Sequence, residues 1–268
     1  MQGTTQALLI ARDGTIVTEE YSGSFSADKA HALYSGTKSF WGALALLAQR
    51  DGIIQLDETV ANSFPQWREE PLKREVTLRH LLTLTAGVPF GGLGKAVPLY
   101  EKALATPLRN APGEHFTYGG IPLQIFGAVL AHKLKTRTPH EYLHERLHEP
   151  AGVTIESWRR LSDGTQPLPT GAFLTARNWL RFGLYMVQHA AEFAECFQGT
   201  DANPRYGLCW WLAPPRVPAD VAYASGSGGQ ALYLIPSERT VIARFGSGGS
   251  LNHGAFLRHL LATGSKRL

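Results

Sequence analysis

The chain has two cysteines and no long apolar run among its 268 residues. Its uninterrupted apolar segments, such as residues 41–48, are far shorter than the roughly 20 residues that a membrane-spanning helix needs. The apolar stretch near the start, residues 7–11, is too short for a signal-peptide core and no basic residues lead into it. We therefore expect a cytoplasmic protein in which Cys196 and Cys209 are reduced thiols rather than a disulfide.

Charge is also scarce, because Asp, Glu, Lys and Arg together make up 18% of the chain. The 26 basic residues exceed the 22 acidic ones by only four, and the excess is scattered apart from residues 133–137. A nucleic-acid-binding protein would show a basic stripe or a reader motif, and neither is present. The hydrophobic content of 44% is enough for a large core and excludes wholesale disorder. We expect neither a nucleic-acid nor a membrane partner, and the sequence does not indicate an oligomeric state.

Both ends of the chain show strand patterns. Asp13-Gly14 stands between two β-favouring runs, which is a strong signal for a two-residue hairpin turn. An amphipathic helix is predicted after Asn252. An isolated hairpin is only marginally stable, so the runs are expected to share one antiparallel, five-stranded sheet. The five runs are residues 7–11, 15–21, 221–224, 231–235 and 241–245.

The middle of the chain favours helices with clear start signals. Thr77, Thr138 and Thr175 precede helical patterns as N-caps, and Pro122 opens an almost wholly apolar helix. The prediction is an α+β fold in which helices flank the sheet. Residues 1–58 and 205–268 would form the sheet domain, and residues 59–204 an inserted, mainly helical domain. Sites commonly form at such an interface.

A search for a nucleophile finds no Gly-x-Ser-x-Gly, so the nucleophile elbow of the α/β-hydrolases is absent. Ser-x-x-Lys occurs twice, at Ser26/Lys29 and at Ser35/Lys38. The first copy lies in a polar stretch, whereas Ser35 stands just before a segment that favours a buried helix. Residues three apart on a helix share a face, so Lys38 would project beside Ser35.

This spacing has a chemical use. A serine hydroxyl becomes a nucleophile when a nearby base takes its proton, and lysine acts as that base only when burial or a neighbouring cation lowers its pKa. A helix N-terminus would also supply N–H groups to a developing oxyanion. The pattern alone leaves an alternative open, in which Ser35 only caps the helix and Lys38 is an exposed first-turn residue.

The whole series of segments resembles the class C β-lactamase-like serine hydrolases, which include penicillin-binding proteins, carboxylesterases and nylon-oligomer amidases. The resemblance spans nearly the whole chain, and the segments follow in the family's order. They are Leu33-Tyr-Ser-Gly-Thr-Lys-Ser-Phe40, Asp51-Gly-Ile-Ile-Gln-Leu-Asp57, Thr77-Leu-Arg-His-Leu-Leu-Thr-Leu-Thr-Ala-Gly-Val88, Pro112-Gly-Glu-His-Phe-Thr-Tyr118, Gly171-Ala-Phe-Leu-Thr-Ala-Arg177, Tyr206-Gly-Leu-Cys-Trp-Trp211 and Ala224-Ser-Gly-Ser-Gly-Gly-Gln-Ala-Leu-Tyr-Leu-Ile-Pro236.

The resemblance implies a β-lactamase/transpeptidase-like fold and a catalytic set. Ser35 would be the acylated nucleophile and Lys38 its partner. Tyr118 matches the tyrosine of the family's Tyr-x-Asn element, where it would act as a general base whose pKa the lysine holds low.

Two departures from the family pattern bear on the substrate. Gly120 replaces the asparagine expected two residues after Tyr118, and Ala224-Ser225-Gly226 replaces the Lys-Thr-Gly element without its lysine. Ser225, Gly226 and Gly120 are then the candidate substrate-contacting positions. The backbone N–H groups of Ser35 and Ser227 are the candidate oxyanion donors.

One rival motif points to a metal. His144-Glu-Arg-Leu-His148 fits the zinc-protease pattern His-Glu-x-x-His, yet Pro150 ends the helix and no clear third ligand follows. We interpret the histidines as a solvated helix face. The string Gly226-Ser-Gly-Gly-Gln-Ala231 imitates a dinucleotide fingerprint, but strands rather than a helix follow it.

The leading hypothesis is a serine acyl hydrolase that acts on a small-molecule ester or amide through a Ser35 acyl-enzyme, with no metal and no cofactor. It would resemble an esterase and be a poor β-lactamase. One alternative is a penicillin-recognising binding or sensor protein with slow turnover. The other is a zinc hydrolase through His144 and His148.

Overall fold

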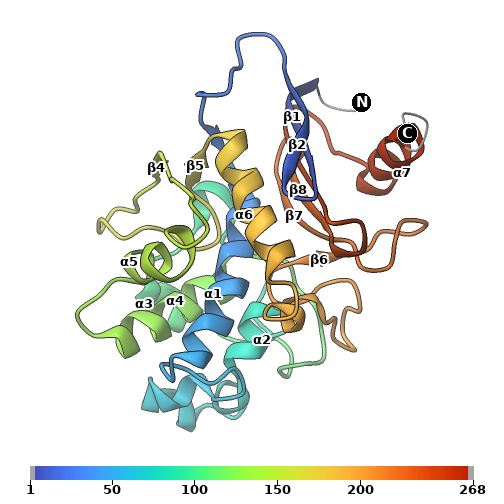
Figure 1. The fold of residues 1–268 in the computed structure, drawn as a ribbon. Helices are drawn as coiled ribbons and strands as arrows, with labels where there is room; N and C mark the ends of the chain where they lie inside the picture. Colours follow the sequence, from blue (N-terminus) through green and yellow to red (C-terminus); the bar gives the residue numbers. More distant parts are fainter. Residues whose placement is uncertain (1–3, 265–268) are drawn as a thin grey trace.

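A computed structural model of the chain describes residues 4–264 and shows a sheet built from both ends of the chain, with helices packed on it (Figure 1). The sheet is antiparallel, and its strands lie in the order β2-β1-β9-β8-β7-β6. The expected α+β fold is confirmed, with one short strand more than the five expected. The strands are β1 (Thr4–Arg12), β2 (Thr15–Tyr21), β6 (Trp211–Leu212), β7 (Ala222–Gly226), β8 (Gln230–Ile235) and β9 (Thr240–Ser247).

The β1–β2 hairpin follows directly from its turn residues. Asp13 and Gly14 have φ angles of 50° and 80°, and this left-handed pair matches the twist of the two strands that it joins. The extra strand β6 contains two residues, and Trp211 pairs with Tyr223 of β7. A run this short has no alternation to detect, which is why the sequence did not indicate it.

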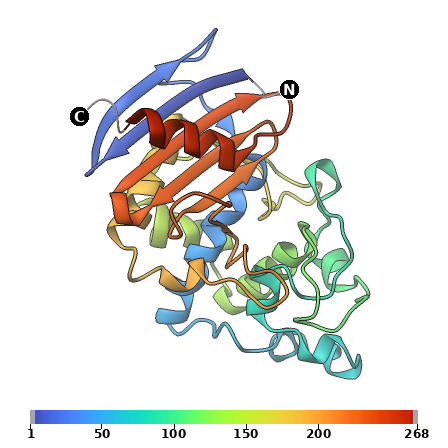
Figure 2. The ribbon, with the colours of Figure 1, turned by 90° about the vertical axis from the view of Figure 1, so that its right-hand side faces the viewer.

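Helices cover both faces of the sheet. Helix α6 packs against β1, β8 and β9, while α7 lies across the opposite face, where Leu257 joins a smaller apolar cluster with Tyr233 and Ile242 (Figures 1 and 2). The α-helices are α1 (Lys38–Arg50), α2 (Leu78–Leu82), α3 (Tyr100–Leu104), α4 (Ile121–Leu134), α5 (Pro139–Leu143), α6 (Ala176–Gln188) and α7 (His253–Gly264). Within the described residues, no helix has the length and apolarity needed to cross a membrane.

Helix α1 lies at the centre of the molecule. Residues 38–48 are all buried, as the apolar sequence of this segment requires. Gly42 allows the backbone to approach closely, because a Cβ atom there would lie 1.8 Å from the carbonyl oxygen of Leu208. The core thus fixes the position of the first turn of α1, where Lys38 lies.

A second, small sheet holds the chain just before Ser35. It has the order β3-β5-β4, formed by β3 (His31–Ala32), β5 (Ala172–Leu174) and β4 (Ser157–Trp158). Beyond β3, the Leu33 N–H donates to the carbonyl of Ala172 at 3.0 Å. The chain that enters the Ser35 turn is therefore fixed by main-chain hydrogen bonds.

Candidate active site

Ser35 lies in a tight 3-10 turn, η1 (Tyr34–Thr37), that leads directly into α1. Strand β7 presses against this turn, since a Cβ atom on Gly226 would lie 2.1 Å from the carbonyl oxygen of Leu33. Only glycine permits that approach. The end of β7 therefore lies directly beside the candidate nucleophile.

Lys38 points back at Ser35 from one turn later, as the three-residue spacing predicts. Its Nζ atom lies 3.1 Å from Ser35 Oγ and 3.1 Å from the carbonyl oxygen of Pro169. The side chain is 1% exposed, and no carboxylate among the described residues forms an ion pair with it. The alternative of an exposed first-turn lysine is therefore wrong.

Burial without a counter-ion has a direct electrostatic consequence. Desolvation lowers the pKa of Lys38 to about 7, because the protein interior disfavours the charged ammonium. A substantial fraction of Lys38 is therefore neutral at physiological pH and able to accept the proton of Ser35.

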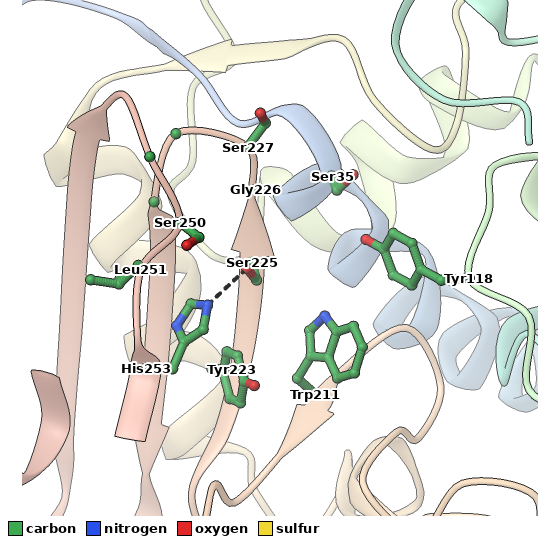
Figure 3. A pocket seen from close by; sticks show the side chains of 13 residues that line it. Ser35, Tyr118, Trp211, Tyr223, Ser225, Gly226, Ser227, Ser250, Leu251 and His253 are labelled. Atoms are coloured by element: carbon green, nitrogen blue, oxygen red, sulfur yellow. Dashed lines mark hydrogen bonds between the residues drawn. The ribbon is translucent and has the colours of Figure 1, made fainter. Parts of the chain in front are cut away.

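Tyr118 faces Ser35 from the segment before α4, and its hydroxyl points toward the serine (Figure 3). The Nζ atom of Lys38 lies over the face of the Tyr118 ring, 4.9 Å from the ring centre. Burial raises the pKa of Tyr118 to about 12, although the Ser35 hydroxyl opposes that rise. The pKa of Tyr118 is thus raised rather than lowered as expected, because desolvation of the phenolate outweighs the hydrogen bond with Ser35.

Ser35 and Tyr118 open onto a cleft of about 520 Å³ beside β7, whereas Lys38 lies buried behind Ser35 and does not line it (Figure 3). A row of rings forms one wall: Trp211 stacks with Tyr118 at 5.6 Å between ring centres and with Tyr223 at 6.4 Å. None of the described residues that line the cleft is an acid, a lysine or an arginine. The lining residues are Ser35, Tyr118, Trp211, Tyr223, Ser225, Gly226, Ser227, Gly228, Gly229, Gly249, Ser250, Leu251 and His253.

A second and smaller cavity of about 340 Å³ begins at the other side of Ser35. Ser35 and Ser227 line both spaces. The remaining wall of the smaller cavity comes mainly from residues 92–94 and from Pro169 and Thr170. Ser35 therefore stands between two compartments, of which only the larger has the aromatic wall.

The two positions that depart from the family pattern have packing reasons. A Cβ atom on Gly120 would lie 2.0 Å from the carbonyl oxygen of Gly92, and Gly120 does not line the cleft. The loop around Gly92 fills the space that an asparagine side chain would need, so any substrate contact at Gly120 stays a prediction for its backbone alone. Ala224 is 1% exposed within the main core, so it presents no group to the cleft.

The structure also adds residues that the sequence did not indicate. The Pro169 carbonyl that accepts from Lys38 is 131 residues away in the chain. His253, the first residue of α7, reaches the cleft from the far face of the sheet (Figure 3). A carbonyl has no sequence signature, and a histidine that opens a C-terminal helix matches no motif considered above.

The two histidines of the zinc-like motif lie in different surroundings. They fall in a π-helical turn, η6 (His144–His148), where His144 is exposed and His148 is buried, with its ring 4.9 Å from that of Phe40. The interpretation of a solvated face is wrong for His148, because its ring is buried with an edge against the ring of Phe40. Across the residues that the structure describes, no cluster of three or more His, Cys, Asp or Glu could hold a metal ion. Cys196 and Cys209 are both buried free thiols.

The pKa of Lys38 sets an expected pH dependence. If neutral Lys38 accepts the Ser35 proton, kcat/KM for an ester should rise with pH through about 7 and then level off. The measurement is kcat/KM between pH 6 and 9, with circular dichroism at each pH to confirm the fold. A profile that is flat across pH 7, or that rises only above pH 9, would show that the lysine does not act as a neutral base.

The comparisons with known proteins agree with this fold. The family model described as Beta-lactamase matches residues 3–262. A Beta-Lactamase/D-Alanine Carboxypeptidase from Pseudomonas syringae superimposes with a TM-score of 0.77 at 17% identity, covering 97% of this chain and 94% of that one. A penicillin binding protein from Bacillus halodurans gives 0.75 at 16% identity, with coverages of 97% and 95%.

A curated relative, the Monacolin J acid methylbutanoyltransferase of Aspergillus terreus, is 28% identical over 204 residues. That match covers 62% of this chain and 48% of the relative, so the chain spans about half the length of the curated protein. The solved structures show the β-lactamase/transpeptidase-like fold, and the family model matches almost every residue. The chain therefore belongs to the Beta-lactamase family, as its ordered motif series predicts.

Proposed function

We propose that the chain is a serine acyl hydrolase that forms an acyl-enzyme on Ser35 and acts on small, uncharged esters. The observation that carries the proposal is the buried contact of 3.1 Å between Lys38 Nζ and Ser35 Oγ, with no counter-ion to keep the lysine charged. A nucleophile beside a base of matched pKa is the arrangement that acyl transfer requires.

The acylation step uses the groups as they stand. Neutral Lys38 takes the proton of Ser35 while Oγ bonds to the ester carbonyl carbon, and the carbonyl oxygen becomes an oxyanion. The backbone N–H groups of Ser35 and Ser227 are the proposed donors to that oxyanion. Collapse of this intermediate breaks the bond to the alkoxy group and leaves an ester on Ser35.

Tyr118 suits the leaving group better than the nucleophile. Because its pKa is raised to about 12, its phenol keeps its proton and donates a hydrogen bond to the departing alkoxide. The proton that Lys38 accepted passes to the alkoxide while Tyr118 holds that oxygen by its hydrogen bond, so both residues return to their starting states. Water then attacks the acyl-enzyme by the reverse sequence and releases the acid, so that one ester and one water give one acid and one alcohol.

The chemistry of the cleft favours esters over β-lactams. Residue 120 has no amide side chain and residue 224 no ammonium, and the described lining residues offer no formal charge to pair with a carboxylate. Polar substrate groups left without partners cost binding and discrimination. An activated ester depends less on such help, because its leaving group departs without strong protonation.

The expected result is rapid turnover of p-nitrophenyl acetate with weak or undetectable turnover of nitrocefin. The measurement is the ratio of kcat/KM for nitrocefin to that for p-nitrophenyl acetate, with Ser35→Ala as the control for spontaneous hydrolysis. A ratio well above one would overturn the ester preference. A labelled penicillin that stays bound, without ester turnover, would instead support the slow-turnover sensor.

A further inference from the structure

A chain of hydrogen bonds leads from the cleft into the sheet on the side of α7. Ser225 Oγ on β7 lies 3.1 Å from Nε2 of His253 (Figure 3). Nδ1 of His253 lies 2.7 Å from the hydroxyl of Tyr233 on β8. Tyr223 covers the imidazole, with 4.5 Å between ring centres. The acylation steps described above use none of Ser225, His253 or Tyr233.

The protonation states of His253 and Tyr233 determine which atom donates in each of these hydrogen bonds. Burial and the charge of Arg244 lower the pKa of His253 to about 4, so the imidazole is neutral with one donor and one acceptor nitrogen. Burial raises the pKa of Tyr233 well above its usual value, so its O–H stays protonated. Among the described residues, the acceptor within hydrogen-bonding distance of that O–H is Nδ1 of His253.

The donation from Tyr233 fixes the tautomer of His253 and therefore the hydrogen bond to Ser225. If Tyr233 donates to Nδ1, the hydrogen of the neutral imidazole lies on Nε2 and is donated to Ser225 Oγ. Ser225 Oγ then accepts a hydrogen bond from His253, and the hydroxyl hydrogen of Ser225 is free to point into the cleft. The opposite tautomer would leave the buried Tyr233 O–H without an acceptor, which is costly.

The cleft indicates which part of the substrate meets this donor. Tyr118, the proposed donor to the leaving group, lines the same compartment as Ser225, whereas the smaller cavity beyond Ser35 has neither residue. The alcohol part of the ester therefore lies along the wall of Trp211 and Tyr223. Flat, uncharged groups suit such a wall, because rings stack there and no described lining side chain offers a counter-charge.

We propose that Ser225 is a specificity-determining donor to an uncharged oxygen on the alcohol part of the ester, and that His253 and Tyr233 are positioning residues that hold it in this role. The proposal rests on the proposed ester hydrolysis. It assigns the preferred substrates to aryl or similarly flat esters whose alcohol part carries a carbonyl or comparable acceptor.

The test compares substrates that differ only in that acceptor. Acetate esters of 3- and 4-acetylphenol carry a carbonyl where those of 3- and 4-isopropylphenol carry a methyl-branched carbon of similar shape. For each pair, the ratio of kcat/KM for the acetylphenyl ester to that for the isopropylphenyl ester cancels effects that both esters share. In the Ser225→Ala variant, at least one ratio should fall roughly tenfold, as expected for loss of one hydrogen bond.

The positioning roles are tested by a double-mutant cycle. Tyr233→Phe keeps the ring but frees the imidazole to change tautomer, so it should lower the same ratio, and His253→Gln should restore most of what His253→Ala loses. Adding Tyr233→Phe to Ser225→Ala should cause no further change, because the effect passes through Ser225. Additive losses, or a ratio that moves in Ser225→Ala but not in Tyr233→Phe, would overturn the positioning roles. An unchanged pair of ratios in Ser225→Ala would overturn the donor itself.

A spectroscopic measurement on the unmodified protein tests the proposal without relying on variants that could misfold. The nitrogen chemical shifts of His253 should show Nε2 protonated and Nδ1 bare at pH 7, and the reverse tautomer would overturn the proposal. Labelling of Ser35 by a fluorophosphonate is measured in every variant. Failure of that labelling in the unmodified protein would count against ester hydrolysis, whereas intact labelling with an unmoved ratio would count against the role of Ser225 alone.

Discussion

The Lys38→Met variant is expected to lose about two to four orders of magnitude in kcat/KM for p-nitrophenyl acetate, the usual contribution of a positioned general base. Methionine has a similar length and is readily buried, so the core around α1 should survive the change. What disappears is the group 3.1 Å from Ser35 Oγ that accepts its proton. Steady-state kinetics at pH 8 measure the loss, since the unmodified lysine is mostly neutral there.

A matched control comes from the other Ser-x-x-Lys copy. Lys29 lies on the surface and donates to the carbonyl oxygen of Ser24 at 3.2 Å, so Lys29→Met should leave the kinetics unchanged. Lys38→Met and Lys29→Met should unfold at similar temperatures. Replacing Lys38 by methionine removes a buried, desolvated amine and breaks no ion pair. A Lys38→Met protein that is folded and retains more than about a tenth of the activity would contradict the role of Lys38 as base.

The free energy of unfolding is expected to fall steeply as the pH drops below about 6.5. Burial lowers the pKa of both His140 and His148 to about 3, and their Nε2 atoms have no hydrogen-bond partner among the described residues. Between pH 6.5 and 3 the unfolded chain binds protons that the folded chain does not, so stability is complete above pH 6.5 and is lost below it. Each histidine would contribute a loss of about 2 kcal/mol between pH 6.5 and pH 5.

Urea unfolding at pH 7.5 and at pH 5 measures this change. His148→Phe should reduce the difference between the two pH values, because its ring packs beside Phe40 without a group to protonate. His115→Gln, at an exposed position, should leave the difference as it is. Equal stability at both pH values in the unmodified protein would show that these imidazoles are not held neutral in the fold.

Local patterns predicted most of the fold. The Asp13-Gly14 turn, the strand runs and the threonine caps before α2, α5 and α6 act over a few residues, so the sequence displays them directly. Strand β6 was missed because two residues carry no period, and the turn at His144–His148 is π-helical rather than α-helical. Such details depend on packing against distant segments, which a pattern does not encode.

The candidate site also combines features that local spacing predicts with features that depend on distant segments. The contact between Ser35 and Lys38 follows from their spacing, and burial of Lys38 follows from the apolar segment that it opens. The lack of space for a side chain at Gly120 depends on Gly92, in a loop that only the folded chain brings near. The raised pKa of Tyr118 likewise depends on how deeply the folded chain buries its phenol, which the family resemblance alone did not indicate.

The central claim is that Ser35 is the acylated nucleophile, and intact mass after reaction with a fluorophosphonate tests it most directly. We expect one added probe mass per chain, located by peptide mapping on Ser35, absent from Ser35→Ala and strongly slowed in Lys38→Met. A folded protein that gains no mass, or that is labelled equally well in Ser35→Ala, would contradict the account.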